Sequence, residues 1–342
     1  MALSVLMLGI VGCGSDDDDS DSGAAASDGG GDSTEMPSSI TIGHYTLANP
    51  YGLAIENGWF DEAFGDTDVE FVELEGTANA LAGLSSGDLD VALIGTPGAA
   101  TALSQDVSTS VMWIYELIDS AEALVLREDV PFEDGGDLEG LSIATPFGST
   151  AHYALLSYME ANDLSESDVE LVDLGPSDLT AAFERGDIDG GWINEPNVTQ
   201  LVNDAGGKVA VTTGDLRDND VVIADIAAAN QDFAEEYPEA LRTYTEVLDR
   251  STQAFLADPD GSYDTMATYL GLEPAEVESI MSGYQFLTAE EQGGDEYLGG
   301  GLADSIAENA RIWEEQDRVP SAADEDTVRS AVTTDFLRSY AG

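Results

Sequence analysis

The chain repeats part of its own sequence, and this repeat constrains the fold more than any other feature. Residues 82–97 read AGLSSGDLDVALIGTP, and residues 181–196 read AAFERGDIDGGWINEP. Upstream, VEFVEL at residues 69–74 is matched by VELVDL at residues 169–174. Each copy reads as a strand, a helix, a Gly-Asp-x-Asp turn, a second strand and a proline. We therefore predict two similar α/β lobes with a cleft between them that binds a small molecule.

Strand and helix patterns alternate through both copies, which predicts parallel sheets with right-handed crossovers. Strands are expected at residues 40–43, 69–74, 91–94, 111–118, 143–145, 169–174 and 191–193. Helices are expected at residues 51–64, 77–84, 97–104, 151–162, 179–185, from Pro196 onward, and at 233–257, 263–270, 275–282 and 302–317.

The same pattern predicts how the chain is divided. Residues 40–123 plus 226–318 form lobe one, residues 124–225 form lobe two, and residues 319–342 form a C-terminal extension. Segments 122–127 and 221–228 are expected to hold the two crossovers between the lobes.

The charge balance is strongly acidic, with 69 Asp+Glu against 10 Lys+Arg and a net charge of -59. The carboxylates are spread along the whole chain, which argues against nucleic acid or anionic lipid headgroups as partners. We interpret the chain as halophilic, because at about 1 M salt the Debye length is roughly 3 Å and such carboxylates barely repel one another. An ordinary acidic secreted protein is the alternative.

The N-terminal residues resemble a membrane anchor. Residues 2–12 are uncharged and mostly apolar, but fewer than the about 20 that span a bilayer. Ile10-Val11-Gly12-Cys13 looks like a lipobox, so Cys13 is the predicted lipidation site and residues 1–13 a truncated signal that lacks its charged region. Residues 14–39 read as a disordered acidic tether. Together they predict a lipoprotein on the extracellular face of the cell membrane; a buried N-terminal segment with an incidental cysteine is the alternative.

No catalytic motif is convincing. Residues 83–87, GLSSG, fit the hydrolase pattern G-x-S-x-G, but that motif needs a strand before it and a helix after it. The order here is reversed, so Gly87 is predicted to end a helix. Two histidines and a single cysteine make a Cys/His zinc site improbable, and no P-loop or dinucleotide fingerprint is present. The chain is predicted not to be an enzyme and to need no cofactor or metal.

Candidate binding residues follow the strands, because open α/β sheets bind ligands at the carboxyl ends of their strands. Four loops occupy such places, at residues 44–49, 95–98, 146–152 and 194–196. Thr96, Ser149 and Thr150 bring hydroxyls to helix N-termini, where free amides and the helix dipole favour anions. Residues 1–126 contain no Lys or Arg, so hydroxyls, amides and His152 would hold an anionic group. Plain helix capping is the alternative role for these hydroxyls.

Six segments match a known family: LIGTP (93–97), AEALV (121–125), ATPFGSTAHY (144–153), RGDIDG (185–190), DFAE (232–235) and FLTAEEQ (286–292). Through them, from about Ile40 to about Gln316, the chain resembles solute-binding proteins of ABC importers in the nitrate/sulfonate/taurine group. It is most similar to taurine-binding proteins, as a haloarchaeal-type lipoprotein. The resemblance implies an α/β, bilobal type II periplasmic-binding-protein fold: two parallel-core lobes joined by two crossover segments, with a helical C-terminal region.

The resemblance also implies site residues. Thr96, Ser149, Thr150 and His152 would face a sulfonate, while Glu122 and Asp225 would meet an ammonium. The strand-end loops add His44, Asn49, Asn194 and Glu195 to the candidate ligand-binding residues. The family usually has an aromatic residue two positions before the proline, where this chain has Asn194. Glu195 then either favours a more cationic ligand or is a solvated acid at a helix start.

The predicted function is therefore the extracellular solute-binding component of an ABC importer. It would capture taurine or a related alkanesulfonate by hinge closure and deliver it, as a monomer, to a membrane permease and its ATPase. One alternative is the same fold binding nitrate, bicarbonate or a pyrimidine precursor of thiamine. The others are an enzyme and the sensing domain of a regulator; the lack of a DNA-binding segment argues against the latter.

Overall fold

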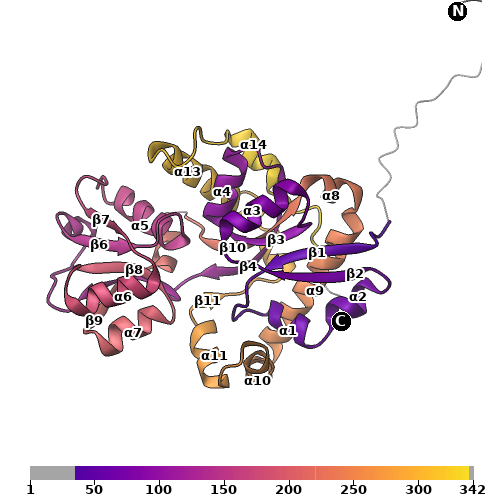
Figure 1. The fold of residues 1–342 in the computed structure, drawn as a ribbon, viewed down its shortest axis with the longest axis horizontal. Helices are drawn as coiled ribbons and strands as arrows, with labels where there is room; N and C mark the ends of the chain where they lie inside the picture. The colour runs from indigo at the N-terminus through magenta and orange to yellow at the C-terminus, as the bar shows by residue number, and fades with distance from the viewer. Residues whose placement is uncertain (1–34, 220, 339–342) are drawn as a thin grey trace, which may run out of the picture. The chain divides into compact units, whose positions relative to one another are not determined.

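Two β-sheets organise the computed structural model, which describes residues 35–219 and 221–338 (Figure 1). The first sheet contains β1 (Ser39–His44), β2 (Asp68–Glu73), β3 (Val91–Gly95), β4 (Thr109–Ile118), β10 (Ala224–Asn230) and β11 (Tyr284–Gln285), in the order β11-β4-β10-β3-β1-β2. The second contains β5 (Glu122–Arg127), β6 (Ser142–Thr145), β7 (Glu170–Asp173), β8 (Gly190–Asn194) and β9 (Gly207–Thr212), in the order β7-β6-β8-β5-β9.

Helices cover both sheets. Those that belong to the first sheet or follow the return to it are α1 (Tyr51–Glu56), α2 (Trp59–Phe64), α3 (Thr77–Ser86), α4 (Thr96–Ser104), α8 (Gln231–Glu236), α9 (Pro238–Ala257), α10 (Pro259–Leu270), α11 (Pro274–Met281), α12 (Ala289–Gln292), α13 (Gly301–Glu315) and α14 (Glu325–Ala331). Those between the strands of the second sheet or just after it are α5 (Thr150–Ala161), α6 (Pro176–Arg185), α7 (Asn197–Asp204) and the 3-10 segments η1 (Gly135–Leu138) and η2 (Thr213–Asn219).

Both sheets have a parallel core with antiparallel neighbours. β1 pairs in parallel with β2 and β3, and β6 pairs in parallel with β7 and β8. β10 runs antiparallel to β3 and β4, and β5 runs antiparallel to β8 and β9. The prediction of parallel sheets is therefore right for the cores and wrong for β5 and β10. These two strands arrive from the other sheet, so no helical crossover sets their direction.

The chain passes between the sheets twice. β4 ends at Ile118 in the first sheet and β5 begins at Glu122 in the second. The return runs from β9 through η2 to β10. Segment 122–127, which was predicted to hold the first crossover, is instead the strand β5, and residues 119–121 make the passage.

The sequence repeat has a structural counterpart in the two Gly-Asp-x-Asp turns. Gly87 and Gly186 end α3 and α6 with φ values of 76° and 75°, the left-handed conformation that favours glycine. The second aspartate of each turn accepts a main-chain hydrogen bond from the central parallel strand of its sheet, β1 or β6. Asp90 Oδ2 lies 2.8 Å from Thr41 N, and Asp189 Oδ2 lies 2.9 Å from Ser142 N. Equivalent carboxylates thus fix equivalent strands.

We expect Asp189→Ala to lower the free energy of unfolding by about 1–2 kcal/mol, because the Ser142 amide loses its carboxylate acceptor. Denaturant unfolding in molar salt measures this change. Asp187→Ala is the matched control, since Asp187 lies exposed in the same turn and pairs with Arg185 on the surface. Equal effects of the two variants would contradict a special role for Asp189.

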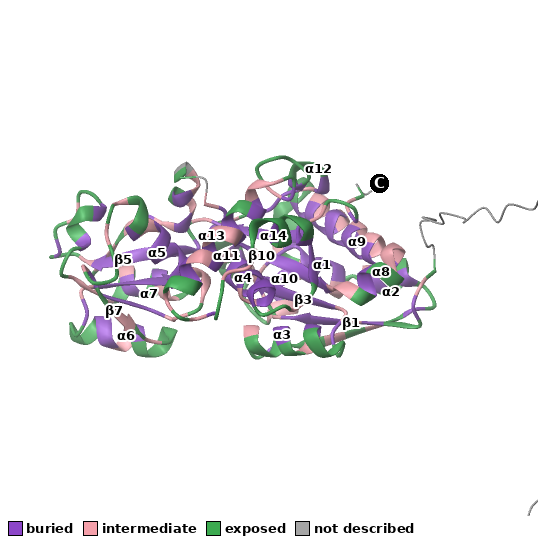
Figure 2. Ribbon diagram, turned by 90° about the horizontal axis from the view of Figure 1, so that it is seen from above, coloured by how far each residue is buried: buried purple, intermediate pink, exposed green. Residues whose placement is uncertain are grey.

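The core runs along the central strands, which are mainly purple in Figure 2, while α3 and α6 also present green, exposed residues. Every residue of β4 is buried, as is usual for a central strand that is covered on both faces. Glu116 is the acidic residue of this strand, a carboxylic acid with 2 % exposure. Its environment is part of the site described below.

α13 contacts elements that belong to both sheets. It packs against α4, and Ser305 Oγ accepts a hydrogen bond from Val222 N at 2.8 Å. On the other side, Tyr153 Oη in α5 donates to Ser305 O at 3.1 Å, and Arg311 pairs with Glu160 of α5 at 2.6 Å. α13 therefore connects the two sheets through side-chain contacts, in addition to the two segments of chain that pass between them.

Some predicted helices are divided in the structure. The helix expected at residues 51–64 is α1 and α2, separated where Gly58 adopts a φ of 68°. The helix expected at residues 233–257 is α8 and α9, because Pro238 starts a new helix. β9, β11, η2, α12 and α14 were not predicted.

Other predictions concern the chain ends. Cys13 and residues 14–34 of the predicted tether lie outside the described residues. Among the residues that are described, no helix is long and apolar enough to cross a membrane. Within the predicted C-terminal extension, Val332 forms a bridge to Val111 of β4, so this segment packs back onto the first sheet.

Candidate functional site

A pocket of about 240 Å³ lies where loops from both sheets meet. Its lining comes from the carboxyl ends of β1, β3 and β6 and from β10, the edge at which α/β sheets bind ligands. A space of this size suits a small molecule. The lining residues are Tyr45, Leu47, Thr77, Leu93, Gly95, Pro97, Gly98, Gly148, Ser149, Thr150 and Asp225.

Two helices begin at this pocket. Gly95 is the N-cap of α4, with Pro97 in its first turn, and Ser149 is the N-cap of α5. Ser149 Oγ accepts a hydrogen bond from His152 N at 3.2 Å. The remaining first-turn amides have no acceptor within their helices, and both helix dipoles place partial positive charge here. The two helix N-termini therefore favour a negatively charged group near their free amides.

Asp225 is the charged residue among the described residues that line the pocket. It lies on β10, paired with Gly95 of β3 and Glu116 of β4. Burial raises the pKa of the Asp225 carboxyl to about 6, although a hydrogen bond from Glu116 acts in the opposite direction. A Cβ added to Gly95 would lie 3.1 Å from Thr150 Cγ2 and 3.4 Å from Asp225 Oδ1, so glycine keeps this corner open.

Glu122 lies behind Thr150 and is not among the lining residues. Its Oε2 accepts a hydrogen bond from Thr150 Oγ1 at 2.6 Å, and its Oε1 accepts one from Thr213 Oγ1 at 2.9 Å. Burial raises the pKa of Glu122 to about 7, and the two hydroxyls offset only part of that rise. Because Thr150 donates its proton to Glu122, the lone pairs of its hydroxyl remain available to a donor in the pocket.

These pKa values predict that the ligand-free protein loses stability as the pH rises. The folded-state pKa of Glu122, about 7, exceeds the ordinary value of 4.5, so the folded state binds more protons in between. The contribution of Glu122 to the free energy of unfolding is complete below about pH 4.5. It falls as the pH rises through about 7 and then levels off, with up to about 3 kcal/mol lost. Unfolding of the protein and of Glu122→Gln between pH 5 and 8 measures the slope. The variant should show the smaller slope, and an equal slope would contradict the assignment.

His152 lies away from the pocket lining. Its ring stacks on Phe147 at 4.3 Å and on Trp313 at 5.5 Å between centroids, and its Nδ1 accepts a hydrogen bond from Gly148 N at 3.2 Å. Burial, and then the positive charge of Arg318, lower the pKa of His152 to about 3. A neutral, stacked imidazole supports the loop before α5 and offers no positive charge to an anion.

Three other predicted residues form the layer around the pocket. The Thr96 hydroxyl accepts from Ala224 N at 2.9 Å and donates to Ala224 O at 3.1 Å, which ties α4 to β10. Asn49 is buried and donates from Nδ2 to Glu116 Oε2 at 3.0 Å. His44 packs between aromatic rings, 3.6 Å from Glu73. Neither Thr96, Asn49 nor His44 is among the lining residues.

Asn194 and Glu195 end β8, where Asn194 pairs in register with Glu122. Asn194 is exposed. The Glu195 carboxylate accepts hydrogen bonds from Thr199 N at 3.1 Å and from Thr199 Oγ1 at 2.9 Å. These contacts are those of an acid at the start of a helix, here α7.

Sequence reasoning missed Tyr45, Thr213 and Glu116. Tyr45 lines the pocket, and burial followed by the Asp225 charge raises its pKa. Thr213 holds Glu122. The sequence did contain an indication for Glu116, because this residue is the carboxylate within the mostly apolar strand TSVMWIYELI. A charge in such a strand marks a paired or functional group.

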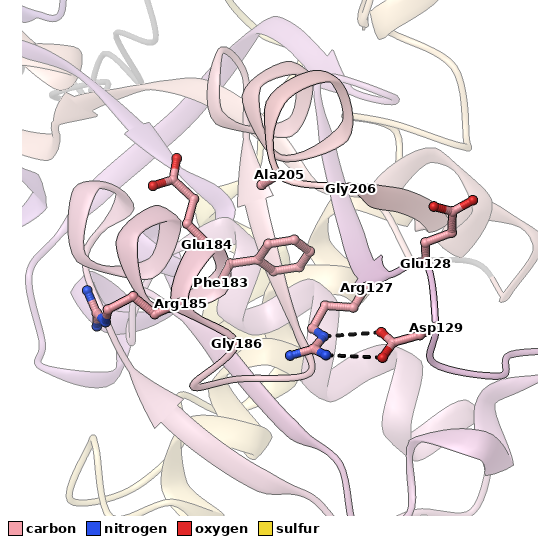
Figure 3. A pocket seen from close by; sticks show the side chains of 9 residues that line it. All are labelled: Arg127, Glu128, Asp129, Phe183, Glu184, Arg185, Gly186, Ala205 and Gly206. Carbon is pink, nitrogen blue, oxygen red and sulfur yellow. Dashed lines mark hydrogen bonds and ion pairs between the residues drawn. The ribbon is translucent and has the colours of Figure 1, made fainter.

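A larger hollow of about 510 Å³ lies at the edge of the second sheet. Figure 3 shows the Arg127 side chain turned toward Asp129, while the Arg185 side chain points away from Asp129. Arg127 binds Asp129 at 3.2 and 3.1 Å, and Arg185 binds Asp187 at 2.7 Å. Glu128 and Glu184 also line the hollow, so its field is not positive and it does not suit an anion.

Known proteins share this architecture. The periplasmic aliphatic sulphonate binding protein of Escherichia coli superposes with a TM-score of 0.71 at 19% identity, over 90% of this chain and 95% of that one. The desulfurization enzyme DSZB also matches, with a TM-score of 0.63 at 16% identity over 88% and 98% of the two chains. The predicted α/β bilobal periplasmic-binding-protein fold is thereby confirmed, and the fold by itself does not separate binding proteins from enzymes.

Sequence comparison points to binding proteins. The taurine-binding periplasmic protein of Escherichia coli (strain K12) is 29% identical over 293 residues, which cover 84% of this chain and 89% of that protein. A putative aliphatic sulfonates-binding protein of Bacillus subtilis (strain 168) is 23% identical over 73% of this chain and 75% of its own length. The family model described as "NMT1/THI5 like" matches residues 48–262. Because that match covers more than half of the chain, the protein belongs to the NMT1/THI5-like family.

Proposed function

We propose that the protein is the extracellular solute-binding component of an ABC importer that captures taurine or a related alkanesulfonate. The observation that carries this proposal is the charge layout of the 240 Å³ pocket. Two helix N-termini and the Asp225 carboxylate line this pocket together, with Asp225 paired to Gly95, the N-cap of α4. A small zwitterion with a sulfonate at one end and an ammonium at the other can use both the helix N-termini and the carboxylate. The names of the taurine-binding and sulfonates-binding relatives support the same ligand class.

In this proposal the sulfonate oxygens accept hydrogen bonds from first-turn amides of α4 and α5. The ammonium donates to Asp225 and to the lone pairs of Thr150, whose proton is already engaged by Glu122. Thr96, Asn49 and His152 support the surrounding elements. Binding draws the two predicted lobes, residues 40–123 plus 226–318 and residues 124–225, together and presents the closed form to a permease. The protein performs no chemistry on its ligand and acts as a monomer.

A thermal-shift panel in about 2–3 M salt tests the ligand class. It contains taurine, ethanesulfonate, nitrate, bicarbonate, sulfate and a thiamine-type pyrimidine. A ligand at roughly a hundred times its dissociation constant adds about 2.7 kcal/mol to stability, which raises the unfolding midpoint. We expect taurine to give the largest shift. A shift with nitrate or the pyrimidine, and none with either sulfonate, would overturn the proposal.

We also propose that Cys13 carries a lipid that holds the protein on the extracellular face of the membrane. The motif Ile10-Val11-Gly12-Cys13 supports this proposal. Cys13→Ser should move the protein from the membrane fraction to the medium, as cell fractionation and immunoblotting would show. A variant that stays in the membrane fraction would exclude a lipid on this cysteine as the anchor.

A further inference from the structure

Glu116 is a buried acid directly behind the proposed ammonium site. It lies on β4 with 2 % exposure, next to Asp225 of β10 in the strand pairing. Asn49 Nδ2 donates to Glu116 Oε2 at 3.0 Å. Asp225, in contrast, is only half-buried and lines the pocket. Neither the strand pattern nor the family resemblance assigned Glu116 a role.

Glu116 and Asp225 are direct partners across the antiparallel pair of β4 and β10, so their Cβ atoms lie on one face about 5 Å apart and their carboxyl groups can share a hydrogen bond. Two ionised carboxylates are acceptors only, so such a bond requires a proton on one of them. Among the described residues, no cluster of His, Cys, Asp or Glu is arranged to hold a metal ion in place of that proton. The question is therefore which of the two acids holds the proton.

The surroundings place it on Glu116. Desolvation is the largest influence on its pKa and raises it well above the ordinary range, and the Asp225 charge raises it further. Asp225 reaches only about 6, because the bond from Glu116 stabilises its ionised form. Asp225 also faces the pocket, where water or a ligand can solvate its charge.

The groups that face Glu116 from the neighbouring elements give its anion little support. Asp225 on β10 and Tyr284 on β11 interact with Glu116, and Tyr115 is its neighbour along β4. Glu122 on β5 lies near Asp225 and Tyr284. The groups among these that carry a charge carry a negative one, and the Asn49 amide that donates to Glu116 is neutral. An ionised Glu116 would add another negative charge to a water-poor cluster.

We propose that Glu116 is a positioning residue that stays a neutral carboxylic acid at neutral pH and donates a hydrogen bond that orients Asp225 toward the ligand's ammonium. The part of this inference that concerns the ammonium rests on the proposed function. The protonated acid holds one Asp225 oxygen, which leaves the other for the pocket. The site then presents a single carboxylate charge from this pair, matched to a singly charged ammonium.

Infrared spectroscopy of the ligand-free protein tests the protonation state without reference to any ligand. At about pH 8.5, above the pKa of about 7 for Glu122, we expect the carbonyl stretch of a neutral carboxylic acid in the natural protein. Glu116→Gln should remove this band, while Glu122→Gln should retain it. Absence of the band from the natural protein, or its persistence in Glu116→Gln, would overturn the inference.

Calorimetry with taurine in molar salt tests the positioning role. We expect Glu116→Ala to weaken binding about 10-fold or more, because Asp225 loses its donor. Glu116→Gln should rescue most of that loss, since its amide can accept from Asn49 and donate to Asp225. A glutamine variant as weak as the alanine variant would show that the charge of Glu116 matters and would contradict the inference. If the natural protein does not bind taurine, the proposed function fails, and the infrared result still decides the protonation of Glu116.

Discussion

Asp225→Asn should weaken taurine binding about 100-fold while changing ethanesulfonate binding only a few-fold. The two ligands share a sulfonate, and only taurine carries an ammonium. Asp225 is the charged residue among those described in the pocket lining, so the variant removes the charged partner of that ammonium and leaves only the neutral hydroxyl of Thr150. A buried charge-assisted hydrogen bond whose partner is removed costs about 3 kcal/mol, which corresponds to the stated factor. Isothermal titration calorimetry in molar salt measures both affinities.

The matched control is Asp187→Asn, which makes the same change of charge at an exposed site paired with Arg185. It should leave both affinities unchanged, and so exclude a general effect of the protein's net charge. Equal weakening of taurine and ethanesulfonate by Asp225→Asn would mean that Asp225 shapes the pocket without contacting an ammonium.

Transfer from molar salt to dilute buffer should unfold the protein, and return to molar salt should restore it. With 69 Asp+Glu and 10 Lys+Arg, most carboxylates have no cationic partner available. Arg311 illustrates the shortage, because it is shared by Glu160, Glu308 and Glu315. At about 0.01 M salt the Debye length is roughly 30 Å, so repulsion acts across the whole domain, whereas at about 1 M it is roughly 3 Å.

Circular dichroism in the two buffers measures this effect. We expect the helical signal to fall in dilute buffer and to return on adding salt, with an unfolding midpoint that rises with salt concentration. A circular dichroism spectrum and an unfolding midpoint that do not change between the two conditions would contradict the halophilic interpretation. The protein would then be an ordinary acidic secreted protein.

The sequence was sufficient for the architecture because the architecture rests on local signals. The repeat predicted equivalent turns, and Asp90 and Asp189 do make equivalent bonds to Thr41 and Ser142. Gly87 and Pro97 ended and began helices where expected. Glycine and proline act through their own backbone restrictions, which distant residues do not alter.

The direction of β5 and β10 and the orientation of side chains in the site were not predictable in this way. His152 follows the helix start that suggested an anion ligand, yet its ring stacks on Trp313, which lies in α13 far along the chain. Glu122 meets Thr213 of η2 and Thr150 of α5, two partners that no spacing in the sequence connects. Such contacts depend on tertiary packing, so they become visible only in the folded chain.

The lining of the pocket bears on competition by chloride. In a brine, a site that held its ligand with an arginine or lysine would face molar chloride at the same cation. Here the described lining offers an anion only main-chain amides, hydroxyls and helix dipoles, and the Asp225 carboxylate lies among them. The amides and helix dipoles attract a halide, but the Asp225 carboxylate repels it. A zwitterion is attracted by both, through its anionic end and its cationic end. Under the halophilic interpretation, such a pocket would favour a zwitterion over the chloride of the surrounding salt.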